Sequence, residues 1–108
     1  MTFSDYQSAA ARTINPALTP ERRPLDASAG LAEEAGEVMG LVRKHVFVGH
    51  PLDRGRAIAE LGDALWCIAA LACSLGSSLD EVAASNLEKL RARYPDGFSA
   101  ERSRARDE

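Results

Sequence analysis

Apolar residues recur with a helical period along most of the chain. The clearest stripe consists of Leu31, Ala35, Val38, Val42 and Val46. This spacing of about 3.6 residues predicts a helix that begins near residue 22 or 27 and ends near residue 47. Gly49, His50 and Pro51 follow and end the helix, because glycine and proline interrupt helices.

Three further helices follow from the same period and from capping residues. The first is expected over residues 3–13 and the third over residues 53–75. The fourth is expected to begin at Ser78 and to end at Tyr94. Ser78 and Glu81, three residues apart, have the spacing of a capping box. No segment shows the alternation of a strand, so the sequence predicts an all-α protein.

The third predicted helix carries an apolar run, Ala64 to Cys73, with no polar side to face solvent. A helix that is apolar on every side is buried on every side. Four short helices in one small chain offer little surface to surround it. We therefore expect a four-helix bundle-like single domain over residues 1–108, completed by homo-oligomerisation. The charged tail, residues 99–108, is expected to be mobile or to be ordered by a partner or ligand.

Composition narrows the classes of partner. The net charge of −3 argues against binding a nucleic-acid polymer through a broad basic surface. The ten-residue apolar run is shorter than a bilayer span, so no membrane partner is expected. Cys67 and Cys73 lack metal-site spacing and are interpreted as buried, reduced thiols. The first residues do not form a secretory signal, and together these features predict a cytoplasmic protein.

Two pairs of acidic residues stand out on neighbouring predicted helices. Glu34 and Glu37 form one pair, and Glu60 and Asp63 form the other. A spacing of i,i+3 puts both members on one helical face, where like charges repel. Asp63 also shares its strip with Cys67, so the acids lie at the edge of the core. Although most helical acids are simply solvated, this arrangement favours a divalent cation held by carboxylate oxygens.

Two other charged residues near these pairs have alternative interpretations. Glu33 adds a fifth acid, which either orients a water or acts as a base, or is a solvated glutamate. Arg56 lies one turn before Glu60 and is either a phosphate contact or a helical ion-pair partner of Glu60.

A polar edge on the fourth predicted helix complements the acids. It consists of Asn86, Lys89 and Arg93, spaced i, i+3 and i+7. Carboxylates, a metal and a strip of cationic residues together suit a phosphate-bearing substrate, because the metal and the cations share its negative charge.

These motifs resemble those of a known family. Glu33–Glu37 followed by Glu60–Asp63 resembles the EExxE…ExxD signature of the MazG-like nucleoside triphosphate pyrophosphohydrolases. The segment from Asn86 to Phe98 resembles the C-terminal helix of that family and its exit. The likeness extends from about residue 20 to 100. Some relatives read the base with tryptophans, whereas this chain has only Trp66, on the predicted buried helix.

The resemblance implies an activity, a cofactor and an assembly. The activity is hydrolysis of a nucleoside triphosphate to the monophosphate and pyrophosphate, with Mg2+, or Mn2+ in its place. The implied metal ligands are Glu34, Glu37, Glu60 and Asp63. The implied phosphate contacts are Lys89 and Arg93, with Arg56 and Asn86 beside them. Glu33 or Glu37 would position or deprotonate the attacking water, and the assembly would be a homodimer or a tetramer.

Two alternatives stay open from the sequence. One is the same fold with a specialised substrate: dUTP, phosphoribosyl-ATP or a modified nucleotide. The other is a non-catalytic helical assembly module, in which the acids are a solvated face or a structural metal site.

Overall fold

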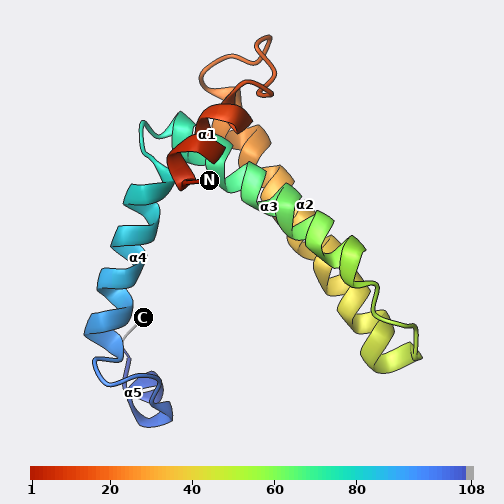
Figure 1. Ribbon diagram of the computed structural model, residues 1–108, viewed down its shortest axis with the longest axis vertical. Coiled ribbons are helices and arrows are strands. Elements are labelled where there is room, and N and C mark those ends of the chain that lie inside the picture. Colours follow the sequence, from red (N-terminus) through yellow and green to blue (C-terminus); the bar gives the residue numbers. More distant parts are fainter. Residues whose placement is uncertain (107–108) are drawn as a thin grey trace.

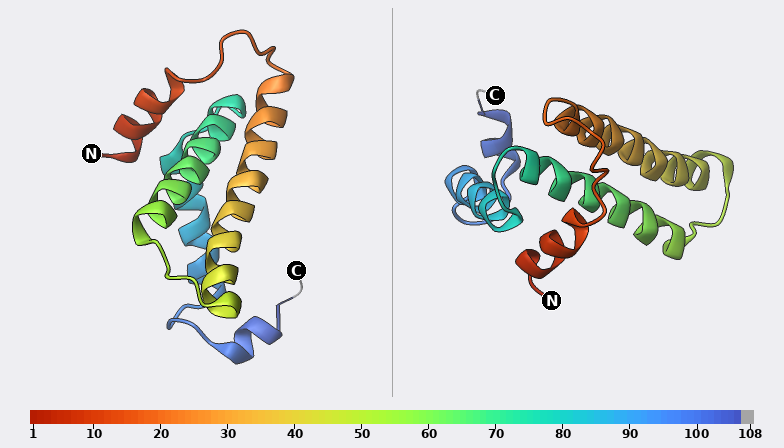
Figure 2. Two further views of the ribbon diagram at one scale, coloured as in Figure 1. Left: turned by 90° about the vertical axis from the view of Figure 1, so that its right-hand side faces the viewer. Right: turned by 90° about the horizontal axis from the view of Figure 1, so that it is seen from above.

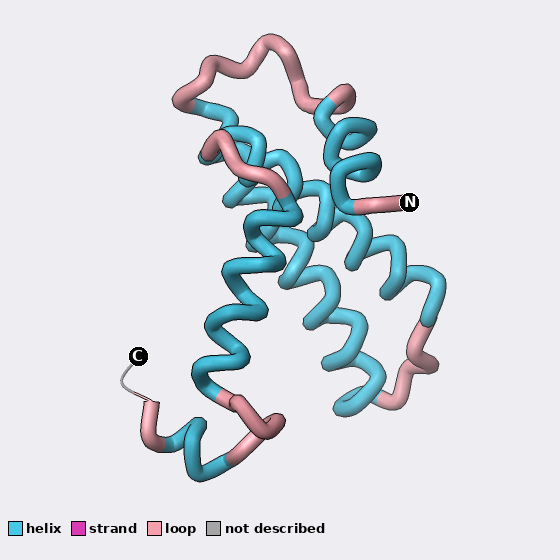
Figure 3. The backbone as a smooth tube through the Cα atoms, turned by 60° about the vertical axis from the view of Figure 1, so that its left-hand side comes forward, coloured by secondary structure: helices cyan, strands magenta, loops and turns pink. Residues whose placement is uncertain are grey.

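The computed structural model describes residues 1–106, and within that range it contains helices and no β-strand (Figure 3). The elements are α1 (Phe3–Ala11), α2 (Arg22–Arg43), the π-helix η1 (Lys44–Val48), α3 (Arg54–Ser74), α4 (Leu79–Arg93) and α5 (Ala100–Arg104). The all-α class and the four longer predicted helices are therefore confirmed.

Side-chain caps begin three of the longer helices. Thr2 and Asp5 form a complete capping box at α1. The Asp53 carboxylate accepts the backbone N–H of Arg56 at 3.0 Å and so caps α3. At α4, Ser78 Oγ accepts the backbone N–H of Glu81. These bonds satisfy backbone donors that have no partner inside the helix, and for this reason the helices begin where the sequence predicts.

The helices α2 and α3 run antiparallel, side by side, and make the most extensive helix–helix contact of the fold (Figures 1 and 2). η1 and residues 49–53 connect them at the far end of this hairpin. α1 crosses α3 near the other end, and α4 leaves that end as a separate arm. The described part of the chain therefore has an open V shape, with α5 at the tip of the α4 arm.

A small core lies where α1, α3 and α4 meet. Ala10, Ala69 and Leu79 are buried there, and Tyr6, Trp66 and Ile68 pack against them. Hydrogen bonds between helices reinforce this junction. The amide of Gln7 donates to the Ser77 carbonyl and its oxygen accepts the Leu79 N–H. Trp66 Nε1 donates to Thr13 Oγ1 at 2.6 Å, and this bond orients its indole at the junction.

The apolar run of α3 is covered within one chain more fully than its composition suggests. Every residue from 64 to 73 is buried or half-buried. The largest exposed apolar side chains lie elsewhere, as Met39 and Phe47 do on α2 and η1. The larger side chains of the run are only half-buried in the single chain, so its completion by a second copy stays a prediction. Alanine makes up much of the run, and its small side chains are covered by α1, α2 and α4 together.

The helix α3 is longer than the ten-residue apolar run that it contains, so the whole helix must also be compared with a membrane span. Of the helices in residues 1–106, α3 alone is long and apolar enough to cross a membrane by those two criteria. Core helices of soluble proteins meet the same criteria, so this is weak evidence. The absence of a membrane partner stays a prediction.

The structure describes residues 99–106 of the tail, whose mobility stays a prediction. Residues 100–104 form the short helix α5, which begins where Ser99 Oγ accepts the Arg102 N–H. Its acidic first turn and basic last turn suit the helix dipole. Residues 107 and 108, also part of the predicted mobile tail, lie outside the described residues.

Candidate metal centre

Three carboxylates from the two helices of the hairpin converge. Glu34 of α2 and Glu60 and Asp63 of α3 each offer one oxygen, and these oxygens all lie within 4.8 Å of one another. Glu34 and Glu60 are half-buried, and Asp63 is exposed. The i,i+3 spacing puts the two α3 acids on one face, and the antiparallel pairing of α2 and α3 brings Glu34 opposite them.

Glu34 is the most perturbed member of this group. Its hydrogen bond to Glu60, its burial and the charges of Glu60, Asp63 and Glu33 raise its pKa from 4.5 to about 7. Its Oε2 atom is buried and has no hydrogen-bond partner among residues 1–106. A buried carboxylate oxygen without a partner is costly. A hard divalent cation, which takes carboxylate oxygens, fits this donor set.

Two neighbours show that the carboxylate group borders the core. Burial raises the pKa of the Cys67 thiol, and the charges of Glu34 and of the other nearby acids raise it further. Burial and the charge of Asp63 raise the pKa of Tyr6. The proximity of Cys67 agrees with the helical strip read from the sequence. Tyr6 was missed, because only the crossing of α1 over α3 brings it near.

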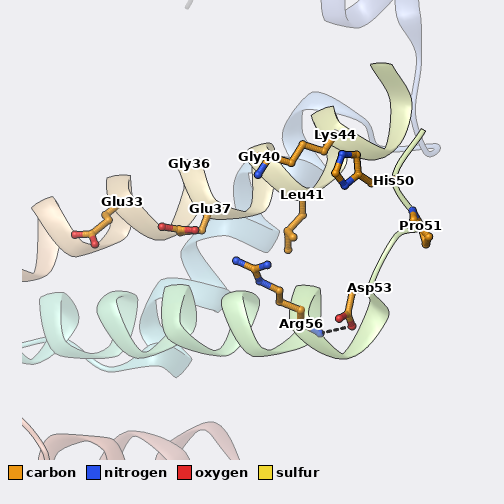
Figure 4. Close-up of a pocket in the computed structure, with 10 residues that line it drawn as sticks. All are labelled: Glu33, Gly36, Glu37, Gly40, Leu41, Lys44, His50, Pro51, Asp53 and Arg56. Atoms are coloured by element: carbon orange, nitrogen blue, oxygen red, sulfur yellow. Dashed lines mark hydrogen bonds between the residues drawn. The ribbon is translucent and has the colours of Figure 1, made fainter. Parts of the chain in front are cut away.

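Glu33 and Glu37 lie outside this three-carboxylate group within the described residues. They line an adjacent cavity of about 330 Å³ between α2, η1 and the start of α3. Figure 4 shows the Glu37 carboxylate directed toward the gap between the two helices. The Arg56 side chain enters the same gap from α3. Glu37, one of the four predicted metal ligands, therefore lines the cavity beside the three-carboxylate group. The predicted phosphate contact Arg56 lines the same cavity.

The polar edge of α4 lies apart from the acids within one chain. Asn86 and Lys89 line a separate hollow, whose other lining residues come from the start of α4 and the turn before it. α4 diverges from the hairpin, so the predicted meeting of acids and cations does not form in the single chain (Figure 1). Periodicity identifies the face of a helix on which a residue lies but not the direction in which the helix leaves its neighbours. Arg93 is half-buried near the end of α4.

Fold and site together define a class: an all-α protein in which an antiparallel helical hairpin presents carboxylates suited to a divalent cation. Residues 22–98 match the family model of the MazG nucleotide pyrophosphohydrolase domain. The chain belongs to the MazG nucleotide pyrophosphohydrolase family, as the acidic motifs predict. The match runs from the start of α2 to Phe98 and includes every predicted site residue. No curated protein and no solved structure matches the chain significantly.

Proposed function

We propose that this protein is a metal-dependent nucleoside triphosphate pyrophosphohydrolase. It would hydrolyse a nucleoside or deoxynucleoside triphosphate to the monophosphate and pyrophosphate. One observation carries the proposal: a three-carboxylate group, with an unpartnered buried oxygen on Glu34, lies in a domain of the MazG family. Carboxylates arranged in this way can hold a divalent cation against the phosphate oxygens of a triphosphate.

The residues that would hold the cation are Glu34, Glu60 and Asp63, with Glu37 from the adjoining turn. The ion would be Mg2+, with Mn2+ as a substitute, because these ions accept oxygen ligands. When bound, it supplies Lewis-acid polarisation of the phosphoryl oxygens.

The other residues of the chain would manage water and charge. A water oxygen attacks the α-phosphorus, the bond from that phosphorus to the bridging oxygen breaks, and pyrophosphate leaves. Glu33 or Glu37 orients the water and takes its proton. Arg56 neutralises phosphate charge from the α3 side. Self-association would bring the polar edge of α4 to the acids. The phosphates would then contact Asn86, Lys89 and Arg93.

Self-association is part of the proposal. A compact domain of 108 residues has an expected radius of gyration of about 13 Å. The Cα atoms here give 16.8 Å. In addition, residues on the exposed side of α2 and on η1 line an apolar groove of about 540 Å³, here called the α2 groove. Its lining residues are Ala35, Val38, Met39, Val42, Arg43 and Phe47. An open chain with such a groove supports a homodimer or a tetramer.

The test is a panel of ribo- and deoxyribonucleoside triphosphates with Mg2+ or Mn2+, with pyrophosphate and monophosphate both measured. Asp63→Asn and Glu37→Gln should each lower the rate by more than about a hundredfold, since even outer-shell partners of metal ligands contribute about 10–100-fold. Glu101→Gln on α5, outside the family match, is the matched control and should keep the wild-type rate.

Circular dichroism must show that each variant keeps its helices. The proposal is refuted if folded wild-type protein with metal releases pyrophosphate from none of the nucleotides. Full activity in Asp63→Asn would refute the assignment of the metal site.

A further inference from the structure

Helix α1 lies outside the part of the chain that matches the family model, which begins at residue 22. It packs on α3 and on α4, near the corner where these two helices meet (Figure 1). This corner sets the angle at which the α4 arm leaves the acidic hairpin. The residues of α1 that contact the corner can therefore influence where the polar edge of α4 lies.

Gln7 connects α1 to the turn between α3 and α4. Its Nε2 atom donates to the Ser77 carbonyl at 3.2 Å and to Cys73 Sγ at 3.3 Å. Its Oε1 atom accepts the Leu79 N–H at 2.8 Å. A side-chain amide offers both N–H donors and a carbonyl acceptor, and Gln7 uses both ends. An ionised glutamate could accept the Leu79 bond but could not donate the other two.

The turn that Gln7 contacts is where the chain changes direction. Gly76 has a left-handed backbone conformation there, with φ of 67°. Leu79 is the first residue of α4, so its N–H has no partner inside the helix. Ser78 caps a later N–H of the same helical turn, and Gln7 takes the N–H of Leu79. The start of α4 is therefore tied to a side chain of α1.

A second contact fixes the segment that contains α1 on α3. Thr13 Oγ1 accepts a hydrogen bond from Trp66 Nε1 at 2.6 Å and donates one to the Ala10 carbonyl at 2.7 Å. Tyr6 and Trp66 also pack against the small core at the corner. α1 is thus anchored on α3, and Gln7 reaches from this anchored helix to the start of α4. A helix held in this way is a brace across the corner.

We propose that Gln7 is a positioning residue, which holds α4 at a fixed angle to the acidic hairpin. The polar edge formed by Asn86, Lys89 and Arg93 is held with it. The proposal rests on the proposed function, in which self-association brings this edge to the acids.

The length of α4 makes this angle important. α4 has 15 residues and extends away from the corner (Figure 1). It is therefore about 22 Å long, and a rotation of about 10° at its start moves its far end by about 4 Å. Displacements much smaller than this weaken contacts with a bound substrate. A side chain at the corner can thus control groups near the far end of the arm, such as Lys89 and Arg93.

The experiment measures the angle as a distance between the ends of the two arms. Nitroxide labels at Arg54→Cys and Ala92→Cys, both exposed positions, report this distance by pulsed electron paramagnetic resonance. Cys67→Ala and Cys73→Ser remove the natural thiols, and the serine keeps an acceptor for the Gln7 amide. Labelled chains are diluted in an excess of unlabelled chains, so that the distance within one chain is observed.

Gln7→Met is the test variant, because methionine has nearly the same shape and makes none of these hydrogen bonds. It should broaden the distribution of distances by about 4 Å, the displacement that a rotation of about 10° produces. Ser8→Ala, at the exposed neighbouring position on α1, is the matched control and should keep the wild-type distribution. A wild-type distribution in Gln7→Met would overturn the proposal.

The kinetics of nucleotide hydrolysis separate positioning from stability. A loss of stability lowers the folded fraction, which lowers kcat and leaves KM unchanged. A displaced α4 edge weakens the contacts with the phosphates. Gln7→Met should therefore raise KM about tenfold, as the loss of one charge-assisted contact does. A lower kcat with an unchanged KM would overturn the positioning role.

Failure of this proposal and failure of the proposed function give different results. A wild type that hydrolyses nucleotides, with the distances and KM unchanged in Gln7→Met, refutes the role of Gln7 alone. A wild type that hydrolyses no nucleotide, with the distances broadened in Gln7→Met, refutes the proposed function. That second result supports the brace at the corner.

Discussion

At the scale of single residues, Glu34 is the carboxylate most affected by burial and by the charges of neighbouring acids. Its carboxylate shares a hydrogen bond with Glu60, faces the charge of Asp63 and leaves one buried oxygen without a partner in residues 1–106. Each of these contacts makes the ionised form less favourable in the folded chain than in water. A bound cation would reverse this effect, because it stabilises the ionised carboxylates.

This residue predicts a pH dependence of stability for the metal-free protein. The pKa of Glu34 is 4.5 ordinarily and about 7 in the folded chain. Between these values the folded state keeps a proton that the unfolded state has lost. The free energy of unfolding should therefore fall as pH rises from about 4.5 to about 7, and the loss should persist above that range.

Urea unfolding in a chelator, at about pH 5 and about pH 8, measures this effect. Glu34→Gln cannot ionise and should lose less stability than the wild type between the two conditions. Identical losses in the two proteins would contradict the raised pKa of Glu34. Glu101→Gln is the control and should follow the wild type.

At the scale of elements, the glycines of α2 have opposite roles. A Cβ at Gly30 would lie 2.9 Å from Cys67 Sγ, across the contact between α2 and α3. A Cβ at Gly36 or Gly40 would enter open space. Gly30 is therefore required for helix packing, and the other two are not. Helical periodicity does not distinguish Gly30 from the other two, because close approach depends on the partner helix.

Alanine substitutions should separate these roles. Gly30→Ala overpacks the contact between the helices and should lower the free energy of unfolding by about 1–3 kcal/mol. Gly40→Ala should raise it by about 0.5–1 kcal/mol, because alanine favours the helix. Chemical denaturation measures both changes.

A double-mutant cycle with Cys67→Ala tests the cause. The cost of Gly30→Ala should shrink when the sulfur is absent, because the two sites are in contact. Equal effects of the two glycine substitutions would contradict the packing described here.

At the scale of the whole molecule, the described chain has an open shape and a small core. The buried residues are mostly alanines, and no large side chain among the described residues is fully buried. Larger apolar side chains stay exposed, including Phe47 at 80% and Met39 at 71% of their surface. Both line the α2 groove, which is the surface we expect a second copy to cover.

Self-association should be visible as a particle mass that is a multiple of 11.6 kDa in sedimentation velocity. Phe47→Glu and Met39→Glu should each shift the distribution toward the single chain, because a charge in a buried contact is costly. Arg12→Glu, at the end of α1, is the control. A monomeric wild type, or glutamate variants with unchanged mass, would refute a role for the α2 groove.

The sequence predicted those features that depend on local spacing. The cap at Ser78 marked where the fourth helix begins, and the i,i+3 pair Glu60 and Asp63 lies on one face, as expected. Features that depend on how helices cross could not be read from local spacing. The α4 edge containing Lys89 was expected opposite the acids, yet α4 diverges from the hairpin.

The amino-acid sequence by itself determined the helices, the carboxylate motif and the family, because helical periodicity and capping act within a few residues. Only the tertiary structure decided which acids meet. The pairing of α2 with α3 brought Glu34 to Glu60 and Asp63. It left Glu37 in the adjacent cavity, which Arg56 also lines. The same pairing, with the π-helix η1 that begins at Lys44, directs Lys44 and Arg56 into one gap from opposite sides. Contacts of this kind depend on helix register and crossing direction, which are set by packing across the whole chain.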